Sequence, residues 1–189
     1  TLALTIPAAV ALIAIPVPLV SVLFERGAFT SDDTAATALA VAVYGLGLPA
    51  FVLQKVLQPL FFAREDTRSP FRYAVWAMIV NAAVAVGLAP VLGWLAPAIA
   101  TTLAGWVMVW MLARGGRRLG DVARFDARFR RRLWRVCVAS VLMGVALWGG
   151  TLLLGPLLEV AGLRFVALAV LIGIGMVSYA IIGQSIGAF

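Results

Sequence analysis

The chain has 189 residues, of which 63% are hydrophobic and only 12% are charged, and its mean hydropathy is +1.06. A soluble domain carries about twice that share of charged residues, so the composition excludes a soluble enzyme or a disordered tail and predicts an integral membrane protein. The chain has no histidine and one cysteine, Cys137, which excludes histidine metal sites, a Ser-His-Asp triad, an internal disulfide and a multi-cysteine zinc site.

Long segments without charge predict an all-α, polytopic transmembrane bundle. A helix that crosses the bilayer needs about 20 apolar residues. The segment 73–113 has no charge and is about twice that length, and Gly and Pro residues cluster at its centre, so we expect two helices there with a short turn between them. The six expected helices span residues 2–23, 33–62, 72–90, 95–113, 133–154 and 165–186.

Local signals support the first two of these helices. Thr30 is a typical helix cap, and the two aspartates that follow it lie where the helix dipole favours negative charge. Prolines inside both helices should bend them, because each removes a backbone hydrogen bond. Such breaks are typical of transporters, although ordinary packing irregularity is the alternative interpretation. The prolines are Pro7, Pro16, Pro18, Pro49 and Pro59.

The arginines predict the orientation of the chain. Twelve of the fourteen lie in or beside the connections 63–72 and 114–132, whereas only Arg26 and Arg164 lie at the opposite membrane face. The positive-inside rule therefore puts both arginine-rich connections, and both ends of the chain, in the cytoplasm. Because the chain starts and stops inside apolar runs, we expect it to be a fragment of a longer membrane protein.

The segment 114–132 is interpreted as a basic amphipathic linker between residues 1–113, which hold four helices, and a two-helix hairpin at 133–189. Apolar residues recur in and just after it at spacings of three and four, as on a helix that lies on an anionic leaflet. The alternative is a solvated linker that only sets topology. Nucleic-acid binding is not expected, because no recognition motif accompanies the arginines.

Lys55 is the first candidate functional residue, because an ionisable group inside a membrane helix is expensive. It could hold a phosphate in a water-filled cavity, or its stem could extend so that the ammonium reaches the interface. Gln54 and Gln58 flank it at helical spacing and favour a polar cavity face.

The connection at 62–70 combines arginines, acids and hydroxyl groups between two helices. Arg64 and Arg68 could pair with Glu65 and Asp66 in a salt-bridged turn, or they could meet an anionic headgroup. Asn81 is a strongly polar side chain in the middle of its expected helix. It could bond to Thr101 or Thr102 of the next helix, or it could line a substrate or ion path.

Four sequence blocks resemble the C-terminal half of the MurJ (MviN) family of lipid II flippases, in the multidrug/oligosaccharidyl-lipid/polysaccharide (MOP) exporter superfamily. They are LFERGAFT at 23–30, YGLGLPA at 44–50, KVLQP at 55–59 and FFAREDTRSP at 61–70. Asn81 fits the next helix of the family pattern. The resemblance covers about residues 1–113 with specific motifs, and residues 114–189 only in layout.

The resemblance implies fourteen helices in the family, of which these six would be the last six. It implies that the whole protein moves undecaprenyl-linked peptidoglycan precursor, lipid II, across the bacterial inner membrane by alternating access between two lobes. The final two helices would help to form a groove for the lipid tail. The family's main cationic substrate residues would lie in its first, second and eighth helices, which are not part of this chain.

The resemblance also bears on individual residues. Lys55, Gln58, Arg64, Asp66, Arg68 and Asn81 are the expected substrate-binding or gating residues. Some members of the family hold a sodium ion; Asn81 and Thr101 match two of its ligands, but Ala85 stands where the family has an aspartate, which argues against a sodium site. We expect no catalytic residue, metal or cofactor, and we expect lipid II, anionic membrane lipids and the N-terminal lobe as partners.

Three alternatives remain at the level of sequence. The first is another MOP-type exporter, of drugs or of polysaccharide-linked lipids, which should lack the FAREDTR run. The second is a membrane-embedded polyprenyl-phosphate enzyme, which needs an acidic magnesium cluster; the adjacent acids are Asp32-Asp33 and Glu65-Asp66. The third is a noncatalytic scaffold subunit. The expected function is transport rather than enzymatic catalysis.

Overall fold

The computed structural model describes residues 2–117, 127–160 and 162–187, and this part of the chain is helical, without β-strands. The elements in chain order are α1 (Leu2–Ala14), α2 (Pro16–Phe24), α3 (Ser31–Phe62), α4 (Arg68–Leu92), the short 3-10 helix η1 (Gly93–Leu95), α5 (Ala96–Arg117), α6 (Ala127–Glu159) and α7 (Arg164–Ile186).

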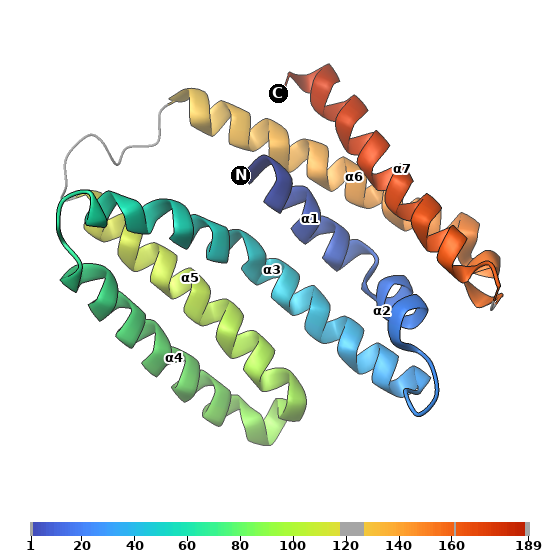
Figure 1. Cartoon of the computed structure of the whole chain (residues 1–189), viewed down its shortest axis with the longest axis horizontal. Helices are drawn as coiled ribbons and strands as arrows, with labels where there is room; N and C mark the ends of the chain where they lie inside the picture. The colour runs from blue at the N-terminus through green and yellow to red at the C-terminus, as the bar shows by residue number, and fades with distance from the viewer. Residues whose placement is uncertain (1, 118–126, 161, 188–189) are drawn as a thin grey trace.

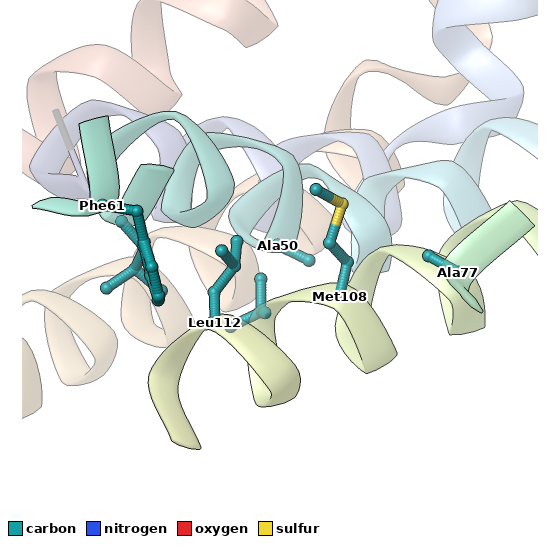
Figure 2. Packing of buried hydrophobic residues seen from close by; sticks show 7 residues of the cluster. Ala50, Phe61, Ala77, Met108 and Leu112 are labelled. Atoms are coloured by element: carbon teal, nitrogen blue, oxygen red, sulfur yellow. The ribbon is translucent and has the colours of Figure 1, made fainter. Parts of the chain in front are cut away.

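The long helices lie side by side in an open row, in the order α4, α5, α3, α1, α6, α7, and α2 packs on α3 (Figure 1). Two buried clusters hold the row together. The first joins α3, α4 and α5 around Phe61 and Leu112 (Figure 2), and the second joins α1, α6 and α7 around Leu147 and Leu171. The row leaves many large apolar side chains exposed, such as Leu153 at 82%. In a bilayer, lipid would cover these side chains.

The helices agree with the predicted membrane bundle. In the described part of the chain, four helical stretches are long and apolar enough to cross a bilayer, or five if the bent pair α1–α2 counts as one span. One of the four, Arg68–Arg117, folds back at η1, so that α4 and α5 lie side by side (Figure 1). This stretch therefore forms two helices that pack side by side, as expected for residues 73–113.

The first expected helix, residues 2–23, is bent as its prolines predicted, and the break divides it into α1 and α2. The chain bends by 77° between α1 and α2. Ile15, at the break, has φ −128° and ψ 43°, outside the helical region. The cause is local: a residue before proline is disfavoured in the α conformation, and Pro16 then suits the first position of the next helix.

Other helix ends differ by a few residues from the expected ones. Helix α3 begins with the predicted cap, in which Thr30 and Asp33 exchange hydrogen bonds in a capping box. Helix α4 starts at Arg68, four residues early. Helix α6 starts at Ala127 and runs to Glu159, so the predicted linker at 114–132 is partly the end of α5 and partly the start of α6. Its middle, 118–126, lies outside the described residues.

The start of α1, the end of α5, the start of α6 and the end of α7 lie at the same end of the bundle as the α3–α4 turn (Figure 1). The connections α2–α3, α4–α5 and α6–α7 lie at the opposite end. The α3–α4 turn and the arginine-bearing ends of α5 and α6 thus lie at one end of the helices, as the charge pattern predicted.

Candidate functional site

An apolar groove of about 250 Å³ runs between α1, α6 and α7. Tyr179 supplies a hydroxyl, and this group donates a hydrogen bond to the main-chain oxygen of Ala3. With its polar atom engaged in this way, the groove presents a hydrocarbon surface. Its lining residues are Leu4, Pro7, Ala8, Ala11, Ile15, Met143, Leu147, Ile172, Gly175, Met176 and Tyr179.

The close approach of α6 and α7 forms one wall of this groove. A Cβ atom on Gly175 would lie only 2.9 Å from a methyl carbon of Leu147, and a Cβ atom on Gly150 would lie 2.8 Å from a methyl carbon of Leu171. Real Cβ contacts are not this short, so glycine at these two positions lets the leucines of the facing helix pack against the backbone.

A second groove, of about 360 Å³, lies between α3, α4 and α5 and contains polar side chains. Asn81 Nδ2 donates a hydrogen bond to Thr101 Oγ1 at 3.3 Å, and Gln54 Nε2 donates to the main-chain oxygen of Gly105 at 3.0 Å. The groove is lined by Phe51, Gln54, Ala77, Met78, Asn81, Ala82, Thr101, Ala104, Gly105 and Met108. Asn81 and Thr101, which the sequence suggested as partners, therefore meet here.

Two further side chains of α5 bind to the backbone of α3 just before Pro49. Thr102 Oγ1 donates to the main-chain oxygen of Val43 at 3.0 Å, and Trp106 Nε1 donates to that of Leu46, also at 3.0 Å. Proline distorts the helical turn that precedes it, and in lipid the carbonyls of that turn need other donors. These bonds join α5 to the turn of α3 that precedes Pro49.

The residues present do not complete the sodium site that some members of the family hold. Asn81 and Thr101 contact each other, and Ala85 adds no oxygen ligand. Across the described residues, no three side chains of His, Cys, Asp or Glu cluster together. The side chains of this groove therefore offer two of the expected ligands without the carboxylate that would balance the charge of a cation.

Lys55 and its neighbours do not share one cavity. Gln54 lines the polar groove, whereas Lys55 is exposed and lies outside its lining, as does the half-buried Gln58. The expected polar cavity face is therefore present at Gln54, whereas Lys55 and Gln58 do not belong to it. Gln54 lies three residues after Phe51 on the same helix, and both line this groove. This spacing in the sequence is the signal that places Gln54 on the groove face.

The turn at 62–68 is ordered by backbone hydrogen bonds. Asp66 N–H donates to Phe61 O and Glu65 N–H donates to Phe62 O, a Schellman arrangement in which Glu65 has φ 59°. Within this turn no ion pair joins Arg64 or Arg68 to the acids, so the expected salt-bridged turn is wrong. The arginine side chains are exposed instead.

Asp66 connects this turn to α4. Its Oδ1 accepts a hydrogen bond from Ser69 N–H at 2.9 Å. Hydrogen bonds from the Ser69 side chain and backbone hold the pKa of the Asp66 carboxyl below its usual value of 3.8, and Arg68 contributes weakly. The acid therefore acts as a helix cap, which explains why α4 starts earlier than expected.

The fold and its two grooves define a multi-pass helical membrane protein. The family model described as "Lipid II flippase MurJ" matches residues 1–173. A protein of Rhizobium tropici named "Probable lipid II flippase MurJ" is 44% identical over 141 residues, which cover 75% of this chain and 26% of that protein. A Vibrio cholerae protein of the same name is 33% identical over 178 residues, covering 93% of this chain and 34% of that protein.

A solved structure entitled "Lipid II flippase MurJ, inward closed conformation" superposes with a TM-score of 0.78 at 26% identity, covering 97% of this chain and 36% of that one. The chain belongs to the MurJ family. It spans about a quarter to a third of the length of the relatives that it matches.

Proposed function

We propose that this chain forms part of a lipid II flippase, which moves undecaprenyl-linked peptidoglycan precursor across the bacterial inner membrane by alternating access. The observation that carries the proposal is the apolar groove between α1, α6 and α7 in a chain of the MurJ family. A polyprenyl tail loses about 0.8 kcal/mol of favourable burial for each CH2 group left in water, so a flippase must shelter it while the headgroup crosses.

The groove has the properties that such a tail requires. Its lining is apolar, and Tyr179 turns its hydroxyl toward the Ala3 carbonyl. It borders α1, which bends sharply at Ile15. We propose that the tail lies along α1, α6 and α7 while the remaining helices of a longer protein enclose the headgroup.

The polar residues predicted from the sequence have roles in the same proposal. Lys55, Arg64 and Arg68 would attract the diphosphate at the cytoplasmic mouth, with Gln58 beside Lys55. Asp66 would hold the α3–α4 turn, and Asn81 would line the polar groove. This scheme requires both ends of the chain in the cytoplasm, and the position of the α3–α4 turn and the arginine-bearing ends of α5 and α6 at one end of the bundle supports it.

The polyprenyl-phosphate enzyme is a weaker candidate. It needs clustered acids for a metal ion, but Asp32-Asp33 and Glu65-Asp66 lie at opposite ends of α3. A helix of 32 residues is about 48 Å long, so within this chain the two acid pairs do not meet. The presence of the FAREDTR run also disfavours the sibling exporters.

Depletion and rescue in cells tests the proposal. We expect depletion of the full-length protein to trap lipid II in the inner leaflet, as measured by its resistance to a lipid II-cleaving enzyme added outside. Ala8→Trp places an indole in the apolar groove and should fail to rescue. Ala169→Trp, on an exposed face of α7 outside the groove lining, should rescue. Normal exposure of lipid II on depletion would overturn the proposal.

A further inference from the structure

Helices α4 and α5 carry the same pair of residues in mirrored order. Arg72 precedes Trp76 by four residues on α4, and Trp110 precedes Arg114 by four on α5. Residues four apart share one face of a helix. Because α4 and α5 run antiparallel as a hairpin, both arginines lie toward the arginine-rich end and both tryptophans lie about 6 Å deeper.

These four side chains line one groove, of about 380 Å³. The Arg114 guanidinium carbon lies 5.5 Å from the centre of the Trp110 ring, a cation–π contact that directs the arginine along the groove. Among the described residues, neither Arg72 nor Arg114 has a carboxylate partner. The lining is completed by Ser69, Tyr73, Met111 and Gly115.

The backbone at Gly115 lets Tyr73 reach this groove. A Cβ atom on Gly115 would lie 2.5 Å from the Tyr73 hydroxyl oxygen, so a larger residue would displace the ring. The Tyr73 ring also packs edge-on against Phe61, with centroids 6.1 Å apart. The groove is therefore part of the packing of α3, α4 and α5. Its Tyr73 ring is held in place by contacts with Phe61 and Gly115.

We propose that this groove, defined by Arg72, Trp76, Trp110 and Arg114, binds the headgroup of an acidic phospholipid. Its phosphate would lie between the two guanidinium groups, and its glycerol and upper acyl carbons would lie against the indoles, which prefer the boundary between headgroups and hydrocarbon. Trp76 and Trp110 are 54% and 59% exposed, so more than half of each side chain stays accessible to a lipid beside the Arg114 contact. Lipid binding at this groove is independent of the proposed transport function.

A lipid accounts for this arrangement better than a soluble phosphate. Two cations alone suit either ligand, but a soluble phosphate makes no use of two indoles placed one turn deeper on both helices. An acidic headgroup also suits the charge of the groove, since each arginine near an anionic leaflet contributes favourably to lipid binding.

Native mass spectrometry of the purified full-length protein tests the proposal with phosphatidylglycerol, phosphatidylcholine and glycerol 1-phosphate as probes. The wild type should retain phosphatidylglycerol in preference to phosphatidylcholine, and glycerol 1-phosphate should not displace it. Arg72→Gln/Arg114→Gln should lower the affinity for phosphatidylglycerol by roughly tenfold or more. The matched control, Arg135→Gln, removes a cation that instead bonds to Gly187 O at 2.9 Å and should leave this affinity unchanged.

A second variant tests the proposal if the double glutamine variant does not fold. Arg72→Lys/Arg114→Lys keeps both charges but loses the planar, two-pronged contact, so it should fall between the wild type and the glutamine variant. Unchanged phosphatidylglycerol retention in the double variants would overturn the proposal. So would an equal loss in Arg135→Gln, or displacement of the lipid by glycerol 1-phosphate.

Discussion

The hydroxyl of Tyr179 on α7 donates a hydrogen bond to the main-chain oxygen of Ala3 on α1. This oxygen lies four residues before Pro7, whose nitrogen has no hydrogen to donate. In the apolar setting of a membrane helix, a carbonyl without a donor is costly. Tyr179, which lies 176 positions away along the chain, therefore supplies the hydrogen-bond donor that the proline lacks.

Removal of that hydroxyl should loosen α1 from α7. We expect Tyr179→Phe to lower the stability of the purified full-length protein by about 1 kcal/mol, the usual scale for a side-chain hydrogen bond between membrane helices. Pro7→Ala restores a local donor, so the effect of Tyr179→Phe should be smaller in that background. Thermal unfolding of the wild type, the two single variants and the double variant gives the coupling energy between the two positions. An equal loss of stability from Tyr179→Phe in both backgrounds would show that Pro7 does not create the need for the Tyr179 hydroxyl.

Asp66 should protect the start of α4. With Asp66→Ala, we expect the Ser69 amide to exchange its hydrogen severalfold faster at neutral pH, as measured by hydrogen exchange of the full-length protein. Arg64→Ala, in the same turn but outside this bond, serves as the control. An unchanged Ser69 amide would argue against the cap.

The pH dependence of the same cap follows from the lowered pKa of Asp66. A carboxyl whose pKa is lower in the folded state stabilises that state when ionised, so its contribution is present at neutral pH. The contribution should be lost only as the pH falls below the usual 3.8 and through the lowered value. A loss of protection of the Ser69 amide already at pH 5, measured relative to its intrinsic exchange rate at that pH, would contradict this sign.

Glu65 should tolerate glycine better than any other substitution, because its φ of 59° lies in the left-handed region. We expect Glu65→Gly to raise the stability of the full-length protein by about 0.5 kcal/mol, since relief of the strain slightly exceeds the entropy cost of glycine. Glu65→Val should lower it, because a β-branched residue is disfavoured at positive φ. The melting temperatures of the two variants should therefore move in opposite directions.

Membrane topology can be measured with single cysteines in a full-length protein that lacks other cysteines. Ala28 and Ala63 are both exposed and lie in the connections on either side of α3. Ala28→Cys should react with a membrane-impermeant maleimide added to intact cells, and Ala63→Cys should react only after the cells are opened. The reverse pattern would invert the proposed orientation.

Much of the architecture could be predicted because hydropathy and charge act on whole helices. The lengths of the apolar runs gave the crossings, and the clustering of Gly and Pro near residue 93 gave the α4–α5 turn. The helix ends were less certain because single side chains decide them. Ile15 ends α1 through the proline that follows it, and Asp66 starts α4 through one hydrogen bond.

The grooves were harder to predict, because they depend on which faces of the helices meet. Lys55 is the first candidate in the sequence because it is charged. The structure instead brings Gln54, one position earlier, into contact with α5. The mirrored pairs of Arg72 with Trp76 and Trp110 with Arg114 are visible in the sequence as equal spacings. Their common groove becomes apparent only when the hairpin places α4 beside α5.

Photo-cross-linking inside the apolar groove tests the central claim most directly. A benzoylphenylalanine at position 8 of the full-length protein, which lines the groove, should form an adduct with lipid II in cells. The same residue at position 169, on an exposed face of α7, should form little or none. No lipid II adduct at position 8, or equal adducts at both positions, would contradict the assignment of this groove to the lipid tail.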